Sequence, residues 1–228
     1  MTTRLNKALA DAGVAARRKC DQLILSGKVQ INGTVVKKPQ HLVAPDDQVI
    51  INGKPVEMQP KLYYVMHKPK GFECTHRKAV GKRIYDLIDI KTRLFSAGRL
   101  DKDSTGLLIL TNDGDFANQV IHPSSNLSKE YLVKTDAEIT HEHLMTLSKG
   151  CEVEGTFVRP VKVKKVRRNV LKIAVKEGKK REVRVMILRA GMHVLELKRI
   201  RIGGLQLGNL PEGAIKTLTP KERLTIFG

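Results

Sequence analysis

Apolar positions in the first 58 residues recur at helical spacing and then at strand spacing. One apolar helical face runs from residue 5 to residue 12. A second runs from residue 16 to residue 24, before a Ser-Gly pair that is typical of a helix C-terminus. An Asn-Gly pair at 32–33 lies between two β-branched runs, which predicts a hairpin. The polar stretch 54–61 holds two prolines and predicts a linker, so we expect a small domain over residues 1–58.

The remaining residues, 59–228, alternate between strand-like and helix-like segments in no regular order. Apolar and β-branched segments predict strands at residues 63–67, 107–111, 131–134, 161–166, 170–175, 194–202 and 214–218. Helices are predicted at 140–148 and 181–189, and a capping box predicts a further helix start at 219–222. Because the strands do not follow a βαβ rhythm, we expect an α+β domain with a mixed, mostly antiparallel sheet flanked by helices.

The charge is strongly unbalanced: the 228 residues carry a formal net charge of +19, and the sequence pI is about 10.0. This excess of lysine and arginine favours a polyanionic partner, and nucleic acid is the commonest one. A solvated basic surface and an anionic membrane are the alternative interpretations of the same charge. Apolar residues make up 41% of the chain, which is enough for a packed core.

No segment has the character of a membrane span or a secretion signal. There is no run of 18 apolar residues, and the first residues lack the apolar core of a signal peptide. The three cysteines, Cys20, Cys74 and Cys151, are widely spaced and form no CxxC pair, which is typical of reduced thiols in the cytosol. We therefore expect a cytoplasmic protein that does not bind membranes.

The segment 98–114, GRLDKDSTGLLILTNDG, is a polar loop that leads directly into a short apolar strand. Such a loop can hold a carboxylate at the rim of a sheet, and Asp101 is the candidate. A surface turn with Asx hydrogen bonds would have a similar composition. A calcium loop is disfavoured, because its twelfth position is Asn112 where a ligating Glu would stand.

Neither a metal centre nor a phosphate-binding loop is predicted. His141 and His143 are two positions apart at a helix start, so they point to different sides, and no third ligand lies close in sequence. The chain has no P-loop, G-x-S-x-G or dinucleotide fingerprint. A nucleotide hydrolase is therefore disfavoured.

The segment 98–114 resembles the catalytic motif of pseudouridine synthases, in the branch named for RsuA and its large-subunit relatives, which act on ribosomal RNA. That branch reads G-R-L-D, a variable stretch, S/T-G-L and T-N-D-G, and all these elements stand between Gly98 and Gly114. The resemblance implies that Asp101 is the catalytic residue and that the turn 112–114 is scaffold.

Two further segments are similar to the same branch. HKPKG at 67–71 resembles its N-K-P-x-G loop, and KEY at 129–131 resembles its K-x-Y motif, which implies that Tyr131 lies against the target base. The base must leave its stack to react, and stacking on an aromatic ring is worth roughly 1–3 kcal/mol. A half-buried strand tyrosine is the alternative interpretation of Tyr131.

A fourth segment, EGKKREVRVM at 177–186, resembles the family stretch E-G-x-x-R-Q-V-R-R-M. It implies that Arg184 pairs with the catalytic Asp; Arg181 and Arg99 are the alternatives. Glu182 and Val185 depart from the pattern, which puts local RNA contacts and helix packing in doubt.

Residues 1–58 resemble the small RNA-binding domain called the alpha-L motif, first described in a small-subunit ribosomal protein. The likeness rests on two short helices, the Arg17-Arg18 pair and the run GKVQING at 27–33. It implies that Arg17, Arg18 and Lys19 contact RNA phosphates, although a solvated helix face would carry a similar run. The residues expected to bind RNA across the chain are Arg17, Arg18, Lys19, Lys28, Lys68, Arg99, Lys129 and Arg181.

The resemblance implies an isomerase that breaks the N1–C1′ bond of uridine and rejoins the base through C5. No net redox or group transfer occurs, so no cofactor is expected. Charge develops at C1′, as in glycosidases, and one carboxylate can stabilise or trap it. A guanidinium, with Arg184 as the candidate, would keep Asp101 ionised and oriented. The sequence leaves open whether Asp101 attacks the sugar or removes a C2′ proton.

The expected partner is ribosomal RNA, with a monomer as the default and no obligate protein partner. The alternative function is a non-catalytic rRNA-binding or ribosome-assembly protein with the same two domains. Such a protein gains nothing from an unneutralised aspartate that faces phosphate, so Asp101, Tyr131 and Arg184 favour the enzyme. The sequence does not indicate which uridine, or which ribosomal subunit, is modified.

Overall fold

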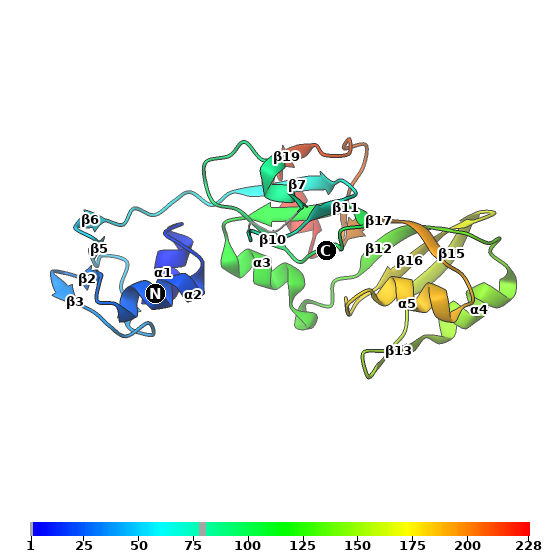
Figure 1. The fold of residues 1–228 in the computed structure, drawn as a ribbon, viewed down its shortest axis with the longest axis horizontal. Helices are drawn as coiled ribbons and strands as arrows, with labels where there is room; N and C mark the ends of the chain where they lie inside the picture. The colour runs from blue at the N-terminus through cyan, green and yellow to red at the C-terminus, as the bar shows by residue number, and fades with distance from the viewer. Residues whose placement is uncertain (1, 78–80) are drawn as a thin grey trace. The chain divides into compact units, whose positions relative to one another are not determined.

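The computed structural model describes residues 2–77 and 81–228, which divide into two compact units (Figure 1). The smaller unit runs to Leu62 and includes the short segments Lys91–Leu94 and Asn112–Gly114. The larger unit comprises Tyr63–Ile90, Phe95–Thr111 and Asp115–Gly228. Of the helices that the described residues form, none combines the length and the apolar character that crossing a bilayer requires.

Two short helices and small sheets make up the smaller unit. Helices α1 (Leu5–Asp11) and α2 (Arg17–Leu25) each bury one apolar face in a common core. The predicted hairpin is confirmed: Asn32 and Gly33 have φ angles of 49° and 81°, and two positive angles are what a tight hairpin turn of this kind requires. The strands are β1 (Thr3–Arg4), β2 (Val29–Ile31), β3 (Thr34–Val35), β4 (Leu42–Val43), β5 (Val49–Ile51) and β6 (Lys54–Pro55), with the order β3-β2-β5-β6 and a β1-β4 pair.

The larger unit is built on one mixed sheet, in the order β15-β16-β12-β17-β11-β7-β19. Its strands are β7 (Tyr63–Lys68), β10 (Phe95–Ala97), β11 (Ser104–Thr111), β12 (Lys129–Thr135), β15 (Lys162–Arg167), β16 (Val170–Val175), β17 (Val194–Ile202), β18 (Leu205–Gln206) and β19 (Ile215–Thr217). Strands β11 and β17 run parallel, while the other pairs in this sheet run antiparallel. The expected α+β class with a mostly antiparallel sheet is confirmed.

The larger unit has two apolar cores, and different helices pack on each of them. Helices α4 (His141–Lys149) and α5 (Glu182–Arg189) pack on one core, and α3 (Gly114–Ile121) contributes to the other. Helix α3 was not predicted, because its start coincides with the turn signal Asn-Asp-Gly and its apolar residues span barely two turns. The predicted capping box is confirmed at Thr219, which begins α6 (Pro220–Thr225). The remaining elements are β8 (Phe72–Glu73), β9 (Lys82–Arg83), η1 (Ile84–Leu87), η2 (Pro123–Ser125), β13 (Cys151–Val153) and β14 (Thr156–Val158).

Candidate active site

The larger unit contains a cleft of about 690 Å³, lined by residues of β10, β12, β16 and β17, by the loop before β11 and by the segment before α5. Asp101 lies in that loop, in a turn closed by a hydrogen bond from the backbone N–H of Ser104 to the Asp101 carbonyl (3.0 Å). The Asp101 side chain is 38% exposed. Its carboxylate can therefore be reached from the cleft.

The ammonium group of Lys68 holds the backbone of this turn. Its Nζ donates to the carbonyls of Pro69 (3.0 Å), Lys102 (3.3 Å) and Ser104 (2.8 Å). Lys68 is 0% exposed, and burial lowers the pKa of its ammonium below the ordinary value. The prediction that Lys68 binds RNA is therefore wrong: the group is enclosed within the fold, and backbone carbonyls occupy the three hydrogens of the ammonium.

Strands β11 and β17 approach each other closely at Gly106, the glycine of the S/T-G-L element. Its φ is +108°, and a Cβ at this position would lie 2.2 Å from the Arg199 carbonyl oxygen. Arg199 is 3% exposed, and its Nε donates to the Leu107 carbonyl at 2.8 Å. Its Nη2 is buried and has no hydrogen-bond partner among the described residues. Since Arg199 also lines the cleft, this donor can serve a bound substrate.

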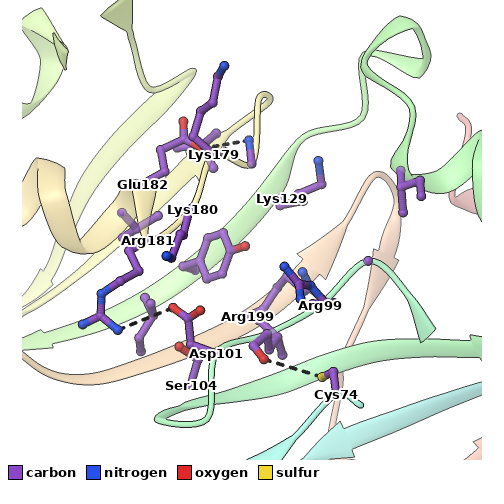
Figure 2. A pocket seen from close by; sticks show the side chains of 18 of the residues that line it. Cys74, Arg99, Asp101, Ser104, Lys129, Lys179, Lys180, Arg181, Glu182 and Arg199 are labelled. Atoms are coloured by element: carbon purple, nitrogen blue, oxygen red, sulfur yellow. Dashed lines mark hydrogen bonds and ion pairs between the residues drawn. The ribbon is translucent and has the colours of Figure 1, made fainter. Parts of the chain in front are cut away.

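Figure 2 shows Asp101 facing Arg181, the residue that precedes α5. Nη1 of Arg181 lies 4.0 Å from Oδ2 of Asp101, and the arginine side chain is 50% exposed. Arg184 instead donates to the Asp103 carbonyl (3.2 Å) and the Ser104 hydroxyl (3.4 Å). The structure thus differs from the expected Arg184 pairing. Arg184 lies within α5, is half-buried, and contacts Asp103 and Ser104. Arg181, at the start of the helix, faces the Asp101 carboxylate.

A buried carboxylate shapes the segment that carries Arg181. Oε2 of Glu182 accepts hydrogen bonds from the backbone N–H groups of Gly178 (2.7 Å) and Lys179 (3.0 Å). Glu182 is 3% exposed, and burial raises the pKa of its carboxyl above the ordinary value. The usual glutamine could accept the same two bonds through its amide oxygen, so this departure from the family pattern keeps the geometry and changes the charge.

Three other predicted residues line the cleft: Arg99, Lys129 and Tyr131. Tyr131 is half-buried on β12, opposite Arg199 on β17. Lys129 donates to the Lys176 carbonyl at 3.2 Å, and burial, reinforced by Arg199, lowers the pKa of its ammonium. Among the described lining residues, seven are cationic and four are acidic. The cleft therefore attracts polyanions while presenting a carboxylate at one wall.

Cys74, Lys179, Lys180 and Arg199 also line the cleft (Figure 2) and were not predicted. The two lysines adjoin Arg181 in a basic run, which is a signal in the sequence. Arg199 is one of three basic residues in the strand 194–202, and nothing local distinguishes it from the other two. Cys74 carried none, because only the fold brings its Sγ to 3.5 Å from the Leu100 carbonyl oxygen. Among residues 2–77 and 81–228, no group of three His, Cys, Asp or Glu side chains is placed to hold a metal ion.

The predicted RNA-binding residues of the smaller unit are all exposed. Arg17, Arg18 and Lys19 form the first turn of α2, and Lys28 directly precedes β2. Their side chains are therefore free to meet phosphates, which stays a prediction.

Comparison with known proteins places these features in a family context. The chain matches the family described as RNA pseudouridylate synthase over residues 62–189 and the S4 domain over residues 3–49. Ribosomal large subunit pseudouridine synthase B of Bacillus subtilis (strain 168) is 37% identical over 227 residues, covering 96% of this chain and 93% of that protein. A chloroplast protein of Arabidopsis thaliana is 42% identical over 226 residues, but this chain spans only 55% of its length. A crystal structure of a pseudouridylate synthase superposes with a TM-score of 0.72 at 27% identity, covering 98% of this chain and 99% of that one.

Proposed function

The chain belongs to the RNA pseudouridylate synthase family, as the motif at residues 98–114 indicated, and we propose that it isomerises a uridine of ribosomal RNA with Asp101 as its catalytic residue. The observation that carries the proposal is the carboxylate of Asp101, which lies accessible in a cationic cleft beside a guanidinium. A module that only binds RNA gains nothing from an accessible carboxylate in a cationic cleft, so the position of Asp101 supports a chemical role.

The proposed reaction breaks the N1–C1′ bond of the target uridine and forms a C5–C1′ bond. C5 loses its proton to solvent and N1 takes up a proton, so the product is an isomer of the substrate. Asp101 stabilises or traps the positive charge that develops at C1′. Arg181 orients the carboxylate in the free enzyme, and Tyr131 offers a stacking face to the flipped base. Since the isomerisation involves no net redox change, the proposal includes no cofactor.

The substrate assignment draws on the relatives, one of which is named for the large ribosomal subunit. The S4 match and the exposed basic turn of α2 support RNA contacts in the first domain, whose boundary we propose at residue 58. We also propose that the protein acts as a monomer in the cytoplasm.

The proposal is tested by release of tritium from C5 of labelled uridine in unmodified ribosomal RNA. We expect release by the wild type and none by Asp101→Asn, with unchanged folding and RNA affinity. Asp103→Asn is the matched control, since Asp103 is an exposed aspartate of the same loop, and it should retain turnover. RNA binding by the wild type without release would support a ribosome-assembly protein instead.

A further inference from the structure

The large sheet carries a line of lysines that runs across neighbouring strands. Lys164 on β15 lies opposite Lys172 on β16, Lys172 lies opposite Leu132 on β12, and Leu132 lies opposite Lys198 on β17. We call Lys164, Lys172 and Lys198 the lysine row. It crosses four strands, a span of about 14 Å at the usual spacing between strands.

The lysine row lies on the face of the sheet that is turned away from the catalytic cleft. The next residues along the same strands, Val133, Leu171 and Leu197, are buried in the core covered by α4 and α5, which lie along this part of the sheet in Figure 1. Because side chains alternate between the faces of a sheet, the lysine row points to the opposite side. Tyr131 packs against that core and lines the cleft. The cleft therefore lies on the core side of the sheet, and the lysine row lies on the other side.

The lysine row borders a second hollow, a groove of about 480 Å³. Lys172, Lys198 and Arg201 line it together with polar residues of the segment 206–209. Arg201 is paired with Glu130 at 3.1 Å. Among the described residues no ion pair involves Lys164, Lys172 or Lys198, so the groove keeps unneutralised charge.

Lys164 and Lys172 face each other across adjacent strands, and like charges in that position destabilise a sheet. The lysines are flexible point charges that bind phosphates without reading sequence. We propose that the lysine row and its groove bind phosphates of the substrate RNA outside the modified nucleotide. The inference rests on the proposed function in taking RNA as the substrate, and it adds a second RNA surface on the far side of the catalytic sheet.

The test compares Lys172→Gln/Lys198→Gln with a control, Lys149→Gln/Lys221→Gln, which removes the same charge at exposed positions that line neither hollow. Dissociation constants are measured over a range of salt concentrations for the full-length protein. The probes are an unmodified large-subunit ribosomal RNA transcript, a short uridine-containing oligonucleotide and poly-glutamate.

We expect the row variant to bind the transcript about three- to tenfold more weakly and to keep its affinity for the oligonucleotide. The slope of log affinity against log salt should fall by about 1.4–1.8, as expected for two lost phosphate contacts, and the control should change less. The melting temperature should not fall, because a repulsive pair is relieved.

Three results would overturn the inference: transcript binding equal to that of the control, an equal loss for the short oligonucleotide, or a loss confined to poly-glutamate, which would indicate an acidic protein partner. Binding is measured without turnover. A wild type that releases no tritium would therefore reject the proposed function, while the transcript data would still decide the role of the row.

Discussion

The ammonium group of Lys68 donates a 2.8 Å hydrogen bond to the carbonyl of Ser104, so a buried cation fixes the turn that presents the Asp101 carboxylate. Ser104 in turn donates its N–H to the Asp101 carbonyl. The position of Asp101 thus depends on a side chain that is fully buried.

Lys68→Met should lower both stability and turnover. The substitution keeps the apolar stem and removes the hydrogen bonds to the carbonyls of Pro69, Lys102 and Ser104. The Lys102 carbonyl keeps a bond from the Gly71 N–H, and the loss of the others costs about 1–3 kcal/mol of unfolding free energy. Urea unfolding and tritium release are the measurements. Lys70→Met removes an exposed lysine from the same loop and should change neither; a stable, fully active Lys68→Met would contradict the positioning role.

Arg181→Gln and Arg184→Gln should separate two effects. Arg181 is half exposed, so its loss should leave stability within about 0.5 kcal/mol and lower kcat by about tenfold or more. Arg184 bonds the loop backbone, so its loss should lower stability by about 1–3 kcal/mol as well. If Arg181→Gln retained the wild-type kcat, Arg184 would be the partner of Asp101 in the reacting complex.

Glu182→Gln should be more stable than the wild type at neutral and alkaline pH. Burial raises the pKa of Glu182 above its ordinary value of 4.5. At pH values between 4.5 and this raised pKa, the folded state therefore binds more protons than the unfolded state. Wild-type stability therefore falls as pH rises through that window, and the glutamine variant lacks this loss. Unfolding free energies at pH 5 and pH 8 measure it, with the exposed Glu57→Gln as the control. A pH-independent difference between the glutamine variant and the wild type would refute the expectation.

Replacing Arg17, Arg18 and Lys19 together by Gln should weaken RNA binding without lowering kcat at saturating RNA. Three lost phosphate contacts should reduce the salt slope by about 2. The triple variant of Lys37, Lys38 and Lys54 removes equal charge from exposed positions of the same unit. Equal effects of the two variants would show that the turn of α2 is only a solvated face.

The sequence by itself determined the elements that depend on local chemistry. The turn at Asn32-Gly33 requires two positive φ angles that these residues tolerate, and the cap at Thr219 requires a hydroxyl and a carboxylate three residues apart. The motif around Asp101 likewise identified the family, because its residues are contiguous. Helix α3 escaped prediction, since a turn signal stands at its start.

The tertiary structure alone decided where long side chains point. Lys68 resembled a phosphate ligand in sequence, but packing of β7 beside β11 encloses it under the loop. The start of α5 relative to a loop about 80 residues earlier determines which guanidinium faces Asp101. The lysine row exists only because of the register of four strands. Such contacts join residues far apart in the chain, so no local spacing encodes them; burial and strand pairing determine them together.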